Sequence, residues 1–164
     1  NYESIKEVGR LNNSTQQTLV LIKPDGVQRG LIGIIISRME ARGLKIVAMK
    51  LKTVDRNLAG QHYGIHRERP FFSGLVEFIT SSPIVAMVLE GPNAVELVRN
   101  TMGVTNPTEA APGTIRGDLG VNIGRNLIHG SDSPENATGE IALFFESSEI
   151  CEYDKTIDPW IIEP

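Results

Sequence analysis

The sequence predicts a single domain of mixed helices and strands built on one sheet. Apolar runs of strand length alternate with amphipathic stretches of helical period, which indicates an α/β or α+β class. The 164 residues are enough for one domain with a proper core. We see neither an internal repeat nor a linker between two domains. We therefore expect two long helices on one face of a small antiparallel sheet, in a domain over 16–164.

The predicted strands are short and apolar. Residues 17–23 form a continuous apolar run, which suits a strand buried on both faces. Pro24-Asp25-Gly26 is expected to break that strand. Further strands are predicted over 44–54, 83–89 and 126–129.

Periodicity and capping residues predict the helices. Leu31, Ile35 and Met39 recur at every fourth position, and Gly43 is a natural stop. Three further starts are predicted: Asp55 as an N-cap, Asn93 with Glu96 as a capping box, and Ser133-Pro134 as an N-cap with proline at the first position. The predicted helical segments are 31–42, 55–63, 70–80, 93–102 and 133–145. Residues 1–15 are predicted to be a flexible lead-in, and 104–113 a long loop.

Composition limits the class of protein. The content is 40% hydrophobic and 22% charged, as in ordinary soluble globular proteins, and no apolar run approaches the roughly 18 residues of a membrane span. The net charge is −4 and no basic stripe is visible, so no nucleic-acid partner is expected. The single cysteine, Cys151, cannot form an internal disulfide. A reducing compartment, the cytoplasm, is the simplest expectation.

The three histidines fall into two groups. We expect His62 and His66 to be exposed helix or loop residues. They could instead share a metal ion, because positions i and i+4 lie on one helix face; however, Gly64 weakens that helix and no third ligand is obvious. His129 precedes Gly130 at the end of a predicted strand, where a neutral imidazole could act as a nucleophile. A hydrogen-bonded core histidine is the alternative, and this segment alone does not decide between them.

Two further segments could contact an anion. Residues 113–118 combine glycine amides with the Arg116 guanidinium, a combination that suits phosphate. Lys23 ends a buried strand, where it is either functional or a surface lysine with a buried stem. The sequence contains neither a P-loop nor a kinase-type glycine-rich loop followed by Asp-Phe-Gly.

Six segments in register resemble the nucleoside diphosphate kinase family. The most specific is Asn126-Leu-Ile-His-Gly-Ser-Asp132. The others are Lys23-Pro-Asp-Gly-Val-Gln-Arg-Gly30, Gln61-His-Tyr63, Arg69-Pro-Phe-Phe72, Thr105-Asn-Pro107 and Pro112-Gly-Thr-Ile-Arg-Gly-Asp118. The resemblance implies a ferredoxin-like βαββαβ sandwich, with a four-stranded antiparallel sheet, helices on one face, additional helices and a long loop. It implies transfer of a γ-phosphoryl group by a ping-pong reaction between nucleoside di- and triphosphates such as ATP, GTP and GDP.

The resemblance also implies residue roles. His129 would be the nucleophile, oriented by Glu140 and Ser131, with Tyr63 near the transferred group. Mg²⁺ would be the cofactor, held mainly by nucleotide phosphates, with no metal ligand required from the protein. The family assembles as homo-oligomers, and a hexamer is favoured over a tetramer. The residues implied in nucleotide binding are Lys23, Phe71, Arg99, Thr105, Arg116 and Asn126.

Two other functions remain as alternatives. One is a non-catalytic nucleotide- or nucleic-acid-binding regulatory protein on the same fold. The other is a different phosphohistidine phosphotransferase with another acceptor, against which Phe71 and Asn126 favour a nucleoside.

Overall fold

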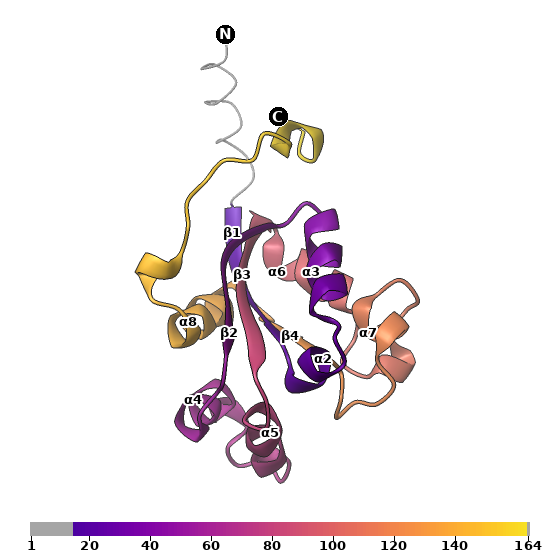
Figure 1. Ribbon diagram of the computed structural model, residues 1–164, viewed down its shortest axis with the longest axis vertical. Coiled ribbons are helices and arrows are strands. Elements are labelled where there is room, and N and C mark those ends of the chain that lie inside the picture. Colours follow the sequence, from indigo (N-terminus) through magenta and orange to yellow (C-terminus); the bar gives the residue numbers. More distant parts are fainter. Residues whose placement is uncertain (1–14, 164) are drawn as a thin grey trace.

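Four strands form one antiparallel sheet in the order β2-β3-β1-β4 (Figure 1). The computed structural model describes residues 15–163, so the predicted lead-in, apart from Thr15, lies outside the described residues. With a helix after the first and third strands, the order is that of the ferredoxin-like sandwich, and this prediction is confirmed. The strands are β1 (Thr15–Ile22), β2 (Lys45–Lys52), β3 (Ile84–Pro92) and β4 (Ile128–Gly130).

The central strand β1 is buried on both faces, as predicted. It pairs with β3 on one side and with β4 on the other. Its alternating side chains enter two separate apolar clusters, Val20 and Ile22 in one and Leu19 and Leu21 in the other. Residues that follow β1 and β4 are therefore held against a sheet centre that is fully closed to water.

One face of the sheet carries the two expected long helices, α3 (Ile32–Ala41) and α6 (Ala94–Met102). Ile35 and Met39 of α3 are buried in the core cluster of that face. The predicted capping box at the start of α6 is wrong. Asn93 takes a left-handed backbone (φ 49°) and its side chain caps nothing, while Gln16 Oε1 accepts from the Val95 amide at 3.4 Å.

The additional helices cover the second face: α4 (Arg56–His62), α5 (Phe72–Ile79) and α8 (Pro134–Phe144). Two of the predicted N-caps are confirmed. The Asp55 carboxylate accepts from the Leu58 amide at 2.8 Å, and the Ser133 hydroxyl accepts from the Asn136 amide at 3.1 Å. Helices thus lie on both faces, which is why β1 excludes water from both sides.

Short helices occupy places where loops or breaks are predicted. Pro24 ends β1 but also begins α2 (Pro24–Gln28), and Thr114 caps α7 (Ile115–Leu119) by accepting from the Gly117 amide at 3.0 Å. Five-residue helices are too short to leave a periodic signal. The 3₁₀ turns are η1 (Gly64–His66), η2 (Pro107–Glu109), η3 (Ser147–Glu149) and η4 (Asp158–Trp160). Within residues 15–163, no helix has the length and apolar character needed to cross a membrane.

Candidate active site

His129 lies in the middle of β4, opposite Leu21 of the central strand. Its ring is held from α8, where Glu140 Oε1 is 2.6 Å from His129 Nε2. A carboxylate can only accept, so Nε2 carries a ring proton; in the neutral form of the ring, Nδ1 then keeps its lone pair. The side chain is 28% exposed, and Nδ1 has no hydrogen-bond partner among the described residues. The structure therefore presents an imidazole that is held at Nε2 and has its second nitrogen free of partners within residues 15–163.

Glu140 stays ionised beside this ring. Burial acts to raise its pKa, but the hydrogen bond and charge of His129 and the hydroxyl of Ser131 lower the pKa by more. Ser131 is fully buried, and its hydroxyl also accepts from the Leu19 amide at 3.3 Å. The predicted trio of His129, Glu140 and Ser131 is thus brought together around the β4–α8 connection.

A second group of predicted residues gathers where β1 ends. Lys23 Nζ donates to Asn126 Oδ1, and Asn126 Nδ2 donates to the Thr105 carbonyl at 2.9 Å. Burial, together with the charges of Arg116 and Arg125 and against the opposing charge of Asp25, lowers the Lys23 pKa to about 8. Lys23 is therefore a partly desolvated cation fixed at a strand end, and not a surface lysine.

Arg116 is buried and binds three backbone carbonyls. Its Nε donates to Asn126 at 3.1 Å, and its terminal nitrogens donate to Gly103 at 3.0 Å and Ile128 at 2.7 Å. Burial first, and then the charge of Arg99, lower the Arg116 pKa to about 10. Two of the five guanidinium N–H groups remain for a ligand. This side chain both ties the 103–128 segments together and brings a charge to the site.

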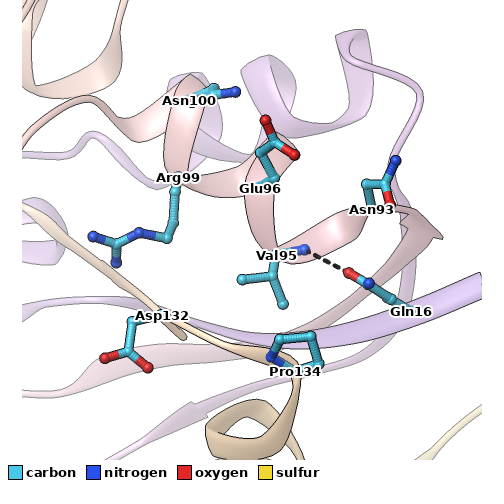
Figure 2. A pocket seen from close by; sticks show the side chains of 8 residues that line it. All are labelled: Gln16, Asn93, Val95, Glu96, Arg99, Asn100, Asp132 and Pro134. Atoms are coloured by element: carbon cyan, nitrogen blue, oxygen red, sulfur yellow. Dashed lines mark hydrogen bonds between the residues drawn. The ribbon is translucent and has the colours of Figure 1, made fainter.

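Arg99 approaches from α6, and one of its terminal nitrogens lies 3.4 Å from the carbonyl of Gly130, the residue after His129. Arg99 also lines a hollow of about 390 Å³, whose lining is shown in Figure 2. Neither His129 nor Lys23 lines that hollow, so this depression is not the place where the predicted catalytic groups meet. The lining residues are Gln16, Asn93, Val95, Glu96, Arg99, Asn100, Asp132 and Pro134.

The remaining predicted residues lie around these groups at different depths. Tyr63 follows α4, and burial, with the charges of Asp25 and Glu140, raises its pKa to about 12. Thr105 is exposed and holds Asn126 through its carbonyl. Phe71 precedes α5 and is 53% exposed, with the His66 ring 5.5 Å away. No described contact joins Phe71 to His129 or Lys23, so the tertiary structure leaves this ring free on the surface.

The expectation that His62 is exposed is wrong. Its side chain is only 1% exposed and lies edge-on to the His129 ring, with 4.7 Å between ring centroids. Burial, together with the charge of His129, lowers the His62 pKa to about 3, so the ring is neutral. The alternative pairing of His62 with His66 is also not formed, since His62 turns toward Glu140 and His66 toward Phe71. An isolated Gln61-His-Tyr63 segment gives no sign of this burial.

Two residues that pattern reasoning left without a role also belong to the site. Asp25 is buried, and its Oδ2 accepts from the Leu127 amide at 3.0 Å, which holds Leu127 in a left-handed conformation (φ 73°) just before β4. Arg125 lies 4.1 Å from the Phe78 ring. The only available signal for Asp25 was its place in the Pro-Asp-Gly break. Its actual contact spans the chain from α2 to β4.

Comparison with known proteins gives one consistent family. The sequence profile described as "Nucleoside diphosphate kinase" matches residues 16–150. Curated relatives of that name include proteins of Herpetosiphon aurantiacus and Archaeoglobus fulgidus, each 57% identical over 148 residues. These alignments cover 90% of this chain and 99% and 98% of the respective relatives. The protein of that name from Synechococcus elongatus is 60% identical over the same length, with 99% of it covered.

Solved structures agree with the sequence relatives. A halophilic nucleoside diphosphate kinase from Halobacterium salinarum, solved in complex with CDP, superposes with a TM-score of 0.88 at 51% identity. A nucleoside diphosphate kinase family protein from Babesia bovis superposes with a TM-score of 0.87 at 43% identity. Each match covers 90% of this chain and 99% of the other.

Proposed function

Since this chain belongs to the nucleoside diphosphate kinase family and is one of its phosphotransferases, we propose that it moves the γ-phosphoryl group of a nucleoside triphosphate to a nucleoside diphosphate through a phosphohistidine at His129. The observation that carries this proposal is the 2.6 Å contact of His129 Nε2 with Glu140, which fixes the ring and, in its neutral form, leaves the lone pair of Nδ1 available for attack. The Halobacterium salinarum relative was solved with CDP, a nucleoside diphosphate, which supports the substrate class.

The reaction has two matching halves. In the first, the Nδ1 lone pair attacks the γ-phosphorus, the N–P bond forms, and the bond to the bridging oxygen breaks. The departing nucleoside diphosphate takes the electron pair of that bond. In the second half, a terminal oxygen of the acceptor diphosphate attacks the same phosphorus and His129 leaves. The ring proton stays on Nε2 throughout, shared with Glu140, which balances the charge that develops on the imidazole.

Fixed cations stabilise the transferred group. Phosphoryl transfer needs in-line positioning and neutralisation of charge on the phosphate oxygens. Lys23, Arg99 and Arg116 supply that charge, and the Thr105 hydroxyl and the Tyr63 side chain complete the phosphate contacts. Lys23 and Asn126, already hydrogen-bonded to one another, contact the sugar hydroxyls. The charge on the nucleotide phosphates would also offset the cost of desolvating Lys23, which is partly buried, and Arg116, which is buried.

The base contact is proposed to be a stacking contact on Phe71. The ring is half exposed and makes no described contact with the catalytic groups, so a base can cover it. Every base has a π-face, so stacking without base-edge hydrogen bonds accepts any base. The enzyme would then act on all common nucleoside di- and triphosphates.

Mg²⁺ is proposed as the cofactor, carried by the nucleotide phosphates. The donor set of the protein agrees with this: the described groups near the proposed phosphate positions are cations, amides and hydroxyls, whereas Mg²⁺ prefers oxygen ligands such as carboxylates, phosphates and water. Oδ2 of the nearby Asp25 accepts from the Leu127 amide, and its Oδ1 is buried without a hydrogen-bond partner within residues 15–163. When bound with the nucleotide, Mg²⁺ would neutralise part of the charge on the phosphate oxygens.

The proposal also includes a single domain over 16–164 and a cytoplasmic location. We further propose that the chain forms a homo-oligomer, with a hexamer preferred. The oligomer is supported by the outer edge strand β2, where Met49 and Leu51 are exposed apolar side chains, and by the exposed Trp160. The Cys151 amide already donates to the Val47 carbonyl of that edge, and the part of the edge beyond Val47 can pair with a second chain. The location is supported by the single, unpaired Cys151.

Transfer of labelled phosphate tests the reaction. Incubation with γ-labelled ATP and Mg²⁺ should leave acid-labile label on the chain, and added GDP should remove it as labelled GTP. His129→Ala should take no label, whereas His66→Ala, a histidine outside the catalytic group, should be labelled normally. An unlabelled native chain, or a labelled His129→Ala chain, would overturn the proposal in favour of the non-catalytic alternative.

A further inference from the structure

The buried ring of His62 has no described partner for either nitrogen. The side chain is 1% exposed, and neither Nδ1 nor Nε2 makes a hydrogen bond within residues 15–163. A neutral imidazole has one N–H donor and one acceptor nitrogen, and leaving such a group unpaired in the interior costs about 1–3 kcal/mol. Neither phosphoryl transfer nor the packing against Tyr63 and Phe144 accounts for these two nitrogens.

The unpaired ring faces two other groups that can bind a metal. His62 Nδ1 is 3.7 Å from Glu140 Oε1, too far for a hydrogen bond, and the same oxygen is 2.6 Å from His129 Nε2. One ligand atom from each of the three residues lies within 4.8 Å of the other two. In a tetrahedral zinc site, bonds of about 2.0–2.1 Å separate the ligand atoms by roughly 3.3 Å. Movements below about 1 Å would therefore bring these three side chains to that spacing.

We propose that His62, His129 and Glu140 form a binding site for a transition-metal ion of the zinc type, and that the bound ion blocks phosphorylation of His129. Two imidazoles and one carboxylate are a donor set found in zinc proteins, and a water molecule can take the fourth position. The partly exposed His129 and Glu140 leave an entry path from the solvent side. Mg²⁺ does not compete, because it prefers oxygen ligands.

The block follows from the tautomer of His129. A metal ion bound at Nε2 takes the lone pair of that nitrogen, so the ring proton moves to Nδ1. Nδ1 then has no lone pair with which to attack phosphorus. No bond to phosphorus forms and no proton is lost from the neutral ring. This consequence rests on the proposed role of His129 as the nucleophile, whereas metal binding itself does not.

The three histidines of the chain allow a direct test on the native protein. The ring-proton NMR signals of His62 and His129 should shift on titration with one equivalent of Zn²⁺, and those of His66 should not. Millimolar Mg²⁺ should move none of the three. Co²⁺ in place of Zn²⁺ should give the visible absorption of a tetrahedral site. Unmoved signals for His62 and His129, or an equal shift of His66, would overturn the site.

A matched pair of variants tests the ligand role and the block. His62→Phe keeps an aromatic ring against Tyr63 and Phe144 but removes the metal ligand. It should weaken Zn²⁺ binding by ~10-fold or more, because losing even a residue that only hydrogen-bonds to a metal ligand costs that much. His66→Phe should bind as the native chain does. Each rate of phosphorylation is compared with the same variant's metal-free rate, and Zn²⁺ should inhibit the native chain and His66→Phe but not His62→Phe.

Other results would separate the two proposals. Equal inhibition of both variants, or stoichiometric Zn²⁺ binding with no loss of labelling, would overturn the block at His129. A native chain that is never labelled in the absence of zinc would overturn the proposed function instead, while the histidine signals would still report on the metal site.

Discussion

Glu140 Oε1 lies 2.6 Å from His129 Nε2, although the two residues belong to different elements and are separated by 11 positions in the chain. The contact fixes which ring nitrogen carries the proton and which direction the other nitrogen faces. Both residues lie on regular elements: His129 on a strand paired with the centre of the sheet, and Glu140 on α8, a helix packed against β1.

Glu140→Gln is expected to reduce kcat about 10- to 100-fold, the range typical when an orienting partner is lost. The amide can still accept from Nε2 but carries no charge to balance a positive imidazole. Rapid-quench labelling of His129 should show the loss in the phosphorylation step. Glu135→Gln, an exposed change in the first turn of the same helix, is the control. Equal rates for both variants would contradict the orienting role.

Substitutions at Arg116 and Arg99 should differ in whether they lower the stability of the fold or only weaken nucleotide binding. Arg116→Lys removes guanidinium donors from three backbone carbonyls, two of them in buried hydrogen bonds, and each buried group left unpaired costs about 1–3 kcal/mol. We expect a loss of a few kcal/mol in the free energy of unfolding as well as a loss of activity. Arg99→Lys, at an exposed position, should raise KM with little change in stability. Urea denaturation beside steady-state kinetics tests both, and equal stability losses would contradict this account.

Lys23 should give the pH–rate profile an alkaline limb. Burial places its pKa near 8 in the ligand-free protein, so kcat/KM, which reports on the free enzyme, should fall as the pH rises through about 8. Lys23→Gln should show lower activity without that limb. A native profile that stays flat to pH 10 would contradict the assignment.

The lowered pKa of Lys23 also predicts that the free energy of unfolding increases with pH, whereas kcat/KM decreases. Between pH 8 and 10.5 the unfolded chain keeps a proton on Lys23 that the folded chain has lost, so the stability of the ligand-free protein rises with pH. The gain is absent below pH 8, complete above 10.5, and at most about 3 kcal/mol. Urea denaturation at pH 7 and at pH 10 measures this gain, as the change with pH in the difference between the unfolding free energies of the native and Lys23→Gln chains. No change in that difference with pH would contradict the prediction.

Phe71→Ala should weaken the binding of all nucleotides by a similar factor, about 1–3 kcal/mol for a lost stacking contact. Because the ring is half exposed, the melting temperature should change little. Ile65→Ala, at an exposed position before α5, is the control. Calorimetry with ADP, GDP and CDP measures the effect, and a loss confined to purines would contradict stacking.

The regular elements follow closely from local pattern. The apolar run of β1 is visible in the sequence because both faces of that strand are buried. The apolar residues at every fourth position of α3 are visible because one face of that helix is buried. Asp55 and Ser133 are confirmed as caps because capping is a contact within three residues. Asn93 fails as a cap because a capping residue takes an extended backbone, whereas Asn93, at the turn from β3 into α6, has a left-handed one.

The sequence by itself determined the residue types that the proposed reaction would use: a histidine before glycine, a lysine at a strand end, and an arginine in a glycine-rich segment. These are local signals, and the family motifs place them in order. Only the tertiary structure decided that His62 is buried beside His129 and that Asp25 supports the turn into β4. It also decided that Arg116 is as much a structural residue as a charged one. Such contacts join residues separated by 10 to more than 100 positions, and long-range packing has no period that a sequence pattern can reveal.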